Sequence, residues 1–406
     1  MYSFKDGTLF HQLAQKGALN RFIVEDLADT IANCHNMATV NKKKDFGGSR
    51  GIALIIKNNA KLLKQSFSDV IELEKIDALF SLLSHYLSCV SDLLDNRRNS
   101  GQVRLCNGDL LLSSISVTDG RPSLFNPNNT SSIIDVLYDM SYLLMDFKQR
   151  DYSRFASLCF NRYFDITGEG ERGLSGLRVL NLFISIRAAS WALEHLIQSE
   201  NLNDRQQIEQ CIEEAKKSIE LALKILQPQK QILIAIGGLS GSGKSKLARE
   251  MAPHVGNARV VRSDSTRKRL AGVSLNQRLN FDGYSAEMTE RTFKVLFDEV
   301  AFGLQCGYPV IADAVFSNPG YRSEIAEIAR NQGAPFIGIW LEATSKNKFE
   351  RIKSRKRDVS DADAWVLGLQ MKYELGRIDW VKVDSNVSSN EILTTALKLI
   401  DNWETF

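Results

Sequence analysis

The residues of this chain best suited to chemistry lie in the segment GLSGSGKS, which runs from Gly238 to Ser245. This segment fits the phosphate-binding loop pattern, follows the apolar run ILIAIG and precedes KSKLAREMA, which has a helical pattern. Glycines let backbone N–H groups turn toward a phosphate, and a helix N-terminus adds partial positive charge. We therefore expect a site for ATP with Mg²⁺. The predicted nucleotide-binding residues of this loop are Gly238, Ser240, Gly241, Ser242, Gly243, Lys244, Ser245 and Lys246.

Two side chains of the loop have individual predicted roles. Lys244 is expected to reach the β- and γ-phosphate oxygens and to act in catalysis, and the Ser245 hydroxyl is expected to hold Mg²⁺. The alternative is a glycine-rich turn that binds no ligand. A strand before the loop and a helix after it favour the nucleotide site.

A second group of candidates follows the strand pattern ARVVRS. Asp264 is placed at the carboxyl end of this strand, where ligands of parallel sheets bind. Its carboxylate could take the proton of an attacking hydroxyl, and Arg267, one helical turn later, could contact an anionic acceptor. The alternative is that Asp264 caps a helix whose arginines are solvated.

A third carboxylate and a basic segment complete the candidate site. Asp313 ends the strand PVIAD, where a carboxylate can hold the water shell of Mg²⁺, or can be a plain strand-end residue. The segment FERIKSRKRDVSDAD contains Arg351, Arg355 and Arg357, which we call the lid arginines. The spacing of four predicts Arg351 and Arg355 on one helix face, either closing over ATP phosphates or forming a solvated basic face.

The elements that must position these residues differ between the two halves of the chain. With 406 residues, 44% hydrophobic and 24% charged, the composition predicts two globular domains. Helical spacing dominates from residue 9 to 226, with a predicted hairpin at 103–125 around Asp119 and Gly120. Apolar strands then alternate with helices, which predicts a parallel α/β sheet with helices on both faces. The predicted strand runs are QILIAIG, ARVVRS, YPVIADAV, PFIGIWL and WVKVD. We place the domains at residues 1–228 and 229–406.

Composition narrows the classes of partner. A net charge of +3 gives no argument for a dedicated nucleic-acid or membrane binder. No secretory signal or apolar run of about 18 residues is evident, so we expect a cytoplasmic protein. The five histidines lack ligand-like spacing. Free, buried thiols are expected for the six cysteines, which are Cys34, Cys89, Cys106, Cys159, Cys211 and Cys306.

With these motifs in view, residues 229–406 closely resemble the P-loop kinases related to gluconate kinase, zeta toxins and polynucleotide 5′-hydroxyl kinase. The matching segments are GGLSGSGKS, RSDSTRKRLAG, YSAEMTERTF, IADAVF and the lid with SDAD. The resemblance implies that Asp264 is the general base and that Arg267 contacts acceptor or phosphate. It also implies that the lid arginines bind ATP phosphates and that Asp313 serves the metal.

The N-terminal half resembles the aminoglycoside-phosphotransferase-type domain that precedes this P-loop domain in many bacterial relatives. The matching segments are FHQLAQKGAL, CNGDLLLSSI, DGRPSLFN and IDVLYDMSYLLMDF. The family's His-Gly-Asp reads Asn107-Gly108-Asp109 here, its following Asn is Ser114, and its metal-binding Asp is Asn126. The β-rich N-lobe with its ATP-binding lysine is not found ahead of these segments. The resemblance therefore implies a pseudokinase remnant.

These observations lead to a main hypothesis and an alternative. The main hypothesis is transfer of the γ-phosphoryl group of Mg-ATP to an unidentified hydroxyl acceptor: a small molecule, a nucleotide sugar or a polynucleotide 5′ end. The helical half would narrow the acceptor cleft or recruit a protein partner. The alternative is an ATP-gated interaction module with little or no phosphotransfer.

Overall fold

The chain divides into two compact units in a computed structural model that describes residues 8–126, 131–168, 176–354 and 357–403. The first unit comprises Met1–Tyr163 and Leu174–Pro228, and the second comprises Phe164–Gly173 and Gln229–Phe406. The change of unit after Pro228 lies at the predicted domain boundary. The grouping of Phe164–Gly173 with the second unit is not indicated by the sequence pattern.

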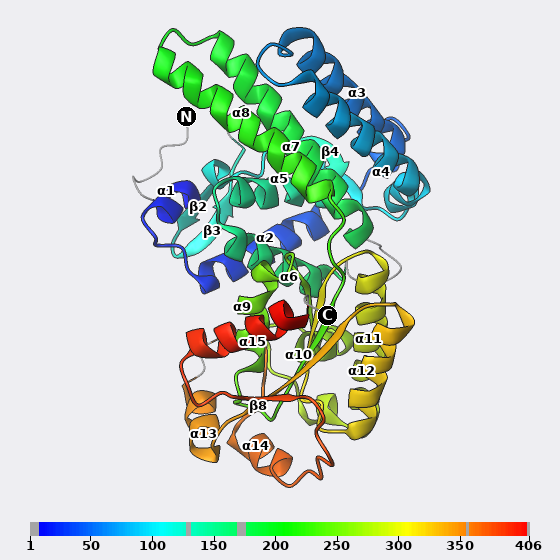
Figure 1. Ribbon diagram of the computed structural model, residues 1–406, viewed down its shortest axis with the longest axis vertical. Coiled ribbons are helices and arrows are strands. Elements are labelled where there is room, and N and C mark those ends of the chain that lie inside the picture. Colours follow the sequence, from blue (N-terminus) through cyan, green and yellow to red (C-terminus); the bar gives the residue numbers. More distant parts are fainter. Residues whose placement is uncertain (1–7, 127–130, 169–175, 355–356, 404–406) are drawn as a thin grey trace. The chain divides into compact units, whose positions relative to one another are not determined.

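The first 228 residues are mainly helical, as Figure 1 shows. The helices are α1 (Phe10–Gln15), α2 (Arg21–Met37), α3 (Gly48–Ser66), α4 (Leu73–Asn99), α5 (Val136–Gln149), α6 (Ser153–Thr167), α7 (Gly176–Glu200) and α8 (Arg205–Leu226). Helix α7 carries buried residues around its whole circumference and packs against α3, α4, α5 and α8. Helix α8 begins after Asp204 because this residue caps it, its carboxylate accepting the Gln207 N–H at 2.9 Å.

Two short antiparallel pairs interrupt these helices. Strands β2 (Ile115–Thr118) and β3 (Arg121–Leu124) form the predicted hairpin, with Asp119 and Gly120 both at positive φ in the two-residue turn. The prediction that this hairpin begins at Val103 is wrong. Strand β1 (Val103–Cys106) pairs instead with β4 (Ser132–Asp135), because its partner comes from beyond the hairpin.

The second unit contains a five-stranded, all-parallel sheet in the order β6-β7-β5-β8-β9, which confirms the predicted α/β class. Its strands coincide with the predicted apolar runs: β5 (Leu233–Gly237), β6 (Arg259–Arg262), β7 (Val310–Asp313), β8 (Phe336–Glu342) and β9 (Val381–Asp384). Parallel strands need crossover connections, which the intervening helices supply. The central strand β5 carries the phosphate-binding loop at its carboxyl end.

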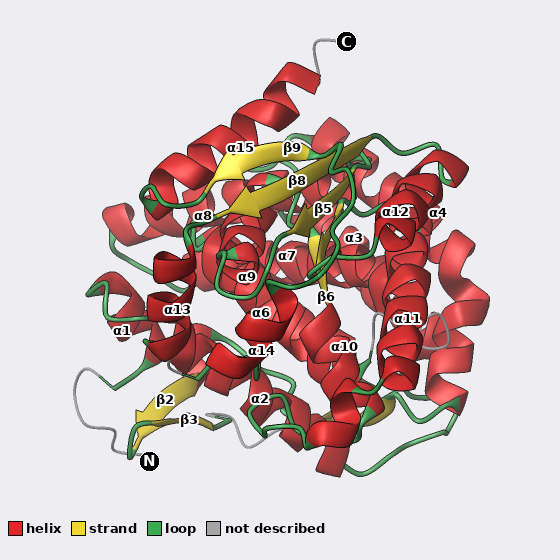
Figure 2. Cartoon of the chain, turned by 90° about the horizontal axis from the view of Figure 1, so that it is seen from below, coloured by secondary structure: helices red, strands yellow, loops and turns green. Residues whose placement is uncertain are grey.

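Helices cover both faces of this sheet, as Figure 2 shows from below. Helices α9 (Lys244–Met251) and α15 (Ser389–Trp403) pack on one face, where Ile234 and Ile236 of β5 point. Helices α11 (Ala286–Gln305) and α12 (Pro319–Asn331) pack on the other, where Leu233 and Ala235 point. Alternate residues of one strand thus serve two cores, and β5 is apolar throughout because both faces are buried.

Two further sequence expectations concern the chain as a whole. The six cysteines are free, but Cys34 and Cys89 are exposed, so the expectation that all are buried is wrong. Both lie on outer faces of helices whose other sides carry the apolar contacts. In the part of the chain that the structure describes, no helix combines the length and apolar character needed to cross a bilayer.

Candidate active site

The phosphate-binding loop joins β5 to α9 through glycines at positive φ. Gly238 has φ +133°, Gly241 +81° and Gly243 +99°. A Cβ on Gly238 would lie 2.6 Å from the Leu341 carbonyl oxygen, and one on Gly241 would lie 2.6 Å from the Lys348 carbonyl oxygen. Conformation and close backbone approach therefore both require glycine at these two positions.

Several polar groups in the loop suit a phosphate ligand. The Ser242 side chain is 0% exposed, and among the described residues its Oγ has no hydrogen-bond partner. Lys244 Nζ donates to the Leu239 carbonyl oxygen at 3.2 Å, within the loop itself. Ser245 lies half-buried in the first turn of α9. An orphaned buried hydroxyl and a glycine cradle at a helix N-terminus fit a bound triphosphate. Lys246 points elsewhere, because its Nζ donates to the Ser389 hydroxyl.

Of the lid arginines, the structure brings Arg351 to the loop. Its Nη1 lies 3.5 Å from the Gly241 carbonyl oxygen and 3.4 Å from that of Ser242, and its Nη2 donates to the Ser385 carbonyl oxygen. The helix that carries Arg351 is α13 (Ser345–Lys353), and the predicted helix face shared with Arg355 falls outside the described residues.

The other two lid arginines contribute less to the described geometry. Arg355 lies outside the described residues. Arg357 is exposed in a bend with φ 49°, a conformation that a helix does not contain. The chain therefore leaves α13 before the arginine-rich segment is complete.

A glutamine that the sequence does not single out contacts the loop as well. The Ser240 N–H donates to Gln370 Oε1 at 2.8 Å, and the bond is buried. Gln370 ends helix α14 (Ala364–Gln370). Because 130 residues separate the partners, no local pattern could have found this contact.

Asp264 lies in the first turn of helix α10 (Ser263–Leu270), half-buried. The N-cap of this helix is Arg262, so the alternative in which Asp264 caps α10 is wrong. A carboxylate in this turn is favoured by the helix dipole. Parallel strands β6, β7 and β5 are in register with Arg262 beside Asp313 and Asp313 beside Ile236. The carboxyl ends that carry Asp264 and the phosphate-binding loop therefore meet at one edge of the sheet.

Arg267 is buried and bonds both to η3, a 3₁₀ turn at Phe281–Tyr284, and to the first turn of α11. Its Nη1 donates to the Gly283 carbonyl oxygen at 3.0 Å and to Thr289 Oγ1 at 3.2 Å. Its guanidinium lies 5.2 Å from the Tyr284 ring centroid. Burial lowers the pKa of Arg267, and the charge of Asp264 opposes that shift. The nitrogen Nη1 therefore donates its hydrogen bonds within the protein.

Asp313 ends β7 and is buried beside the loop strand. Its Oδ2 accepts from Arg262 Nε at 3.2 Å, and Arg262 Nη2 lies 3.6 Å from Asp358 Oδ1. Burial would lower the pKa of Arg262, but the charges of Asp313 and Asp358 outweigh it and raise that pKa. The carboxylate of Asp313 thus lies beside the Arg262 guanidinium at the edge where Mg²⁺ is expected.

Asp361, within the SDAD of the lid, joins three segments near Asp264. It accepts from Lys268 Nζ at 2.9 Å, from the Leu279 N–H at 2.9 Å and from the Tyr284 hydroxyl at 3.3 Å. The motif was visible in the sequence, but its partners were not. This carboxylate neutralises a buried lysine and orders the loop around Tyr284.

In the first unit, the Asn107–Asp109 segment is tied to its own neighbours. Asn107 Oδ1 accepts the Asp109 N–H at 3.1 Å, and Asn126 Nδ2 donates to the Asn107 carbonyl oxygen at 2.7 Å. Burial raises the pKa of Asp109, which the charge of Arg187 opposes. Ser114 is buried in a 3₁₀ turn. Asn126, where the resemblance places a metal ligand, thus makes a backbone contact.

A glycine-rich loop between the central parallel strand and a helix, with Arg351 against it, is the arrangement of a phosphate-binding loop. Residues 233–374 match the family model described as AAA domain. Over 372 residues the chain is 24% identical to an uncharacterized protein of Mycobacterium tuberculosis and to one of Mycobacterium bovis. Each alignment covers 90% of this chain and 73% of the relative.

Solved structures with similarity to this chain include three kinases. An APS kinase of Mycobacterium tuberculosis in complex with AMPPNP and APS is 20% identical, covering 44% of this chain and 99% of its own, with TM-score 0.32. A gluconokinase from Sinorhizobium meliloti is 20% identical over 44% of this chain and 98% of its own, also with TM-score 0.32. A Plasmodium vivax ethanolamine kinase is 15% identical over 55% of this chain and 65% of its own, with TM-score 0.38.

Proposed function

We propose that residues 229–406 transfer the γ-phosphoryl group of Mg-ATP to a hydroxyl acceptor. The observation that carries this proposal is the shared sheet edge. Strands β5, β7 and β6 are adjacent, and their carboxyl ends lie at the same edge of the sheet. The phosphate-binding loop follows β5, Asp313 ends β7, and Asp264 follows β6. A nucleotide on the loop would then have a carboxylate beside its γ-phosphate, as phosphotransfer to a hydroxyl requires.

The residues divide the work as follows. Loop N–H groups and Lys244 bind the β- and γ-phosphates, and Ser245 with Asp313 hold Mg²⁺. Asp264 accepts the proton of the attacking hydroxyl as its oxygen bonds to the γ-phosphorus and ADP leaves. Arg351 stabilises the oxygens of the group in transit. Bound Mg²⁺ supplies neutralisation of phosphate charge.

Arg267 has a positioning role in this proposal. Its Nη1 holds Gly283 and Thr289, so it orders the segment beside Asp264. The phosphate or acceptor contact that the resemblance implies would fall to its other nitrogens. Arg355 and Arg357 stay predicted ATP ligands, to be carried in by closure of the lid.

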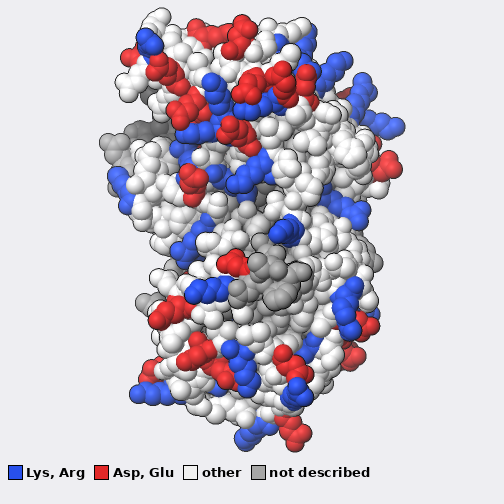
Figure 3. Space-filling view, viewed as in Figure 1, with Lys and Arg blue, Asp and Glu red and all other residues white. Residues whose placement is uncertain are grey.

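The acceptor is a small molecule, a nucleotide sugar or a polynucleotide 5′ end. Figure 3 shows basic and acidic side chains interspersed over the face in view, without a broad basic tract. This distribution, with a net charge of +3, favours a small acceptor over a polynucleotide.

For the helical half we propose a pseudokinase that recruits a protein partner. The support is the segment at Asn107 and Asp109, where one acidic residue of the resembling family's catalytic set is retained. Asn126 contacts backbone rather than offering a carboxylate. Holding Mg²⁺ normally takes carboxylate oxygens, so catalysis by Asp109 is not part of the proposal.

One observation favours the alternative of an ATP-gated interaction module. The Ser240 N–H that a phosphate would use is bonded to Gln370, so nucleotide binding would release α14 from the loop. Such a release could alter how the chain meets a partner without phosphotransfer. Retention of Asp264 beside the loop argues for the enzyme.

The test is transfer of label from γ-labelled Mg-ATP into pooled metabolites and 5′-hydroxyl oligonucleotides. Lys244→Ala should lower the rate about 10²–10³-fold. Asp264→Asn should abolish transfer while sparing ATP affinity, and Asp109→Asn is the matched control that should leave transfer unchanged. ATP binding without labelling of any acceptor by the wild type would reject the kinase in favour of the gated module.

A further inference from the structure

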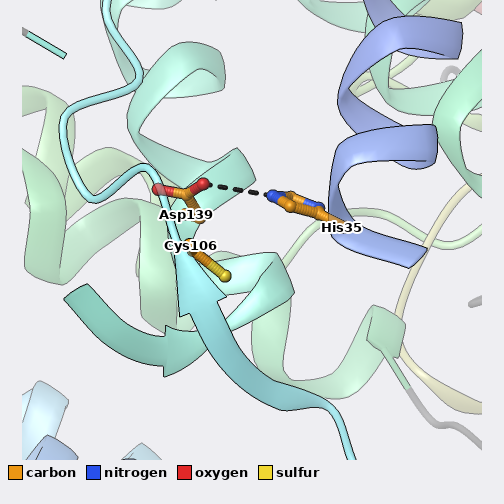
Figure 4. Close-up of side chains that lie close together, drawn as sticks. All are labelled: His35, Cys106 and Asp139. Atoms are coloured by element: carbon orange, nitrogen blue, oxygen red, sulfur yellow. Dashed lines mark hydrogen bonds and ion pairs between the residues drawn. The ribbon is translucent and has the colours of Figure 1, made fainter. Parts of the chain in front are cut away.

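Three metal-ligand side chains from separate elements converge inside the first unit. His35 comes from α2, Cys106 from the end of β1 and Asp139 from α5. They are 4%, 4% and 1% exposed. One ligand atom of each lies within 4.8 Å of the other two, and Figure 4 shows the three side chains around one space. The predicted nucleotide site uses none of them.

The far atoms of two of these ligands are anchored. His35 Nδ1 lies 2.8 Å from the Tyr163 hydroxyl, and Asp139 Oδ1 accepts the Gly108 N–H at 2.8 Å. These bonds leave His35 Nε2 and Asp139 Oδ2 facing each other at 3.1 Å. A metal-binding imidazole almost always donates its other N–H to a neighbour, and metal-binding carboxylates are hydrogen-bonded in the same way. The cluster therefore has the outer contacts of a metal site.

We propose that His35 Nε2, Cys106 Sγ and Asp139 Oδ2 bind one Zn²⁺ ion. Zinc bonds of about 2.0–2.1 Å to nitrogen and oxygen, at tetrahedral angles, place these two atoms roughly 3.3 Å apart, close to the separation observed. The longer zinc–sulfur bond, about 2.3 Å, requires Cys106 Sγ to move nearer to them. Three protein ligands leave the fourth position to a small ligand.

Charge balance favours a divalent ion with this ligand set. Binding of Zn²⁺ would release the Cys106 thiol proton to solvent. The imidazole shifts its own proton from Nε2 to Nδ1, where the Tyr163 oxygen accepts it. A thiolate, a carboxylate and a neutral imidazole then cancel the charge of the ion, as burial demands.

The ion would crosslink α2, β1 and α5 at the segment that contains Asp109. Because Asp139 also holds the Gly108 N–H, metal binding would fix the conformation of Asn107–Asp109. This role is independent of phosphotransfer by the second unit. It makes the helical half a zinc-stabilised domain.

The experiment uses the full chain, stripped with a chelator and titrated with Co²⁺ as a spectroscopic probe. The wild type should take up one Co²⁺ per chain with a thiolate-to-cobalt charge-transfer band, which Zn²⁺ then abolishes. Cys106→Ser should lose the band. Cys89→Ser is the matched control, because Cys89 Sγ lies 3.9 Å from His85 Nε2 in another, exposed thiol–imidazole pair. This variant should keep the band.

Two further readouts separate metal binding from a structural role. Tyr163→Phe removes the outer contact of His35 and should weaken Co²⁺ binding about 10–100-fold. Zn²⁺ should raise the melting temperature of the wild type, which involves no substitution. Absence of the band and of the melting shift in the wild type, or a band that persists in Cys106→Ser, would show a hydrogen-bonded His–Asp pair beside a plain thiol and overturn the proposal.

Discussion

Gly241 and Gly243 allow a quantitative test of how the phosphate-binding loop is built. Both have positive φ, but their surroundings differ. A Cβ on Gly241 would meet the carbonyl oxygen and Cα of Lys348 at 2.6 and 3.0 Å, whereas the nearest atom to one on Gly243 is Arg351 Nη1 at 3.9 Å. The Lys348 atoms are backbone atoms of α13 and cannot rotate away.

The expected destabilisation follows from these two terms. A side chain in the left-handed region costs about 1–2 kcal/mol, which applies to both Gly243→Ala and Gly241→Ala. Forcing extra volume against packed atoms adds about 1–3 kcal/mol at Gly241 alone. Gly243→Ala should therefore lower the free energy of unfolding by about 1–2 kcal/mol and Gly241→Ala by about 2–5 kcal/mol.

The assay is urea unfolding followed by tryptophan fluorescence. All tryptophans except Trp191 lie in residues 229–406, so the signal reports mainly the second unit. The slope against urea should stay unchanged, which shows that the same surface is exposed in both variants. Equal unfolding free energies for the two variants would refute the close approach of α13 to the loop.

Three other substitutions test contacts that the structure adds. Gln370→Ala frees a loop N–H for phosphate and should tighten ATP binding about two- to tenfold by calorimetry; weaker binding would contradict it. Asp361→Ala leaves buried Lys268 unpaired and should cost about 3–5 kcal/mol of unfolding free energy, against about 1 kcal/mol for the helix-capping control Asp363→Ala. Burial lowers the pKa of Lys148 from its ordinary value of 10.5 to about 8. The buried charge therefore lowers the free energy of unfolding by its full amount below pH 8, and by progressively less as the pH rises from 8 to 10.5. Lys148→Met should raise the melting temperature at pH 7, with a gain that shrinks above pH 8; a constant gain would contradict this.

Local structure could be predicted from the sequence where the residues that determine a conformation all lie within one short segment. The loop GLSGSGKS needs positive φ at its glycines and a helix after it, and the glycines and the helical pattern are both visible in consecutive residues. The five sheet strands could also be predicted from the sequence, because a strand buried on both faces is apolar throughout. The turn at Asp119 and Gly120 belongs to the same group, since a two-residue hairpin favours this pair.

Contacts between distant segments could not be predicted. The spacing of the basic segment predicted a helix that carries Arg351, but it did not predict that Arg351 lies against the loop carbonyls. Strand β1 was assigned to the nearer hairpin, although its partner is β4. A helix end and a strand partner both depend on packing free energy from remote residues, which a local pattern does not contain.

The sequence by itself determined the α/β class of the second half, the conformation of the phosphate-binding loop and the strand-end carboxylates, because each depends on periodicity or on backbone requirements within a few residues. Only the tertiary structure decided that Gln370 bonds the Ser240 N–H, that Asp361 holds Lys268, and that His35, Cys106 and Asp139 share one buried space. These groups are far apart along the chain. Their proximity comes from the packing of whole helices and strands, which no single segment encodes.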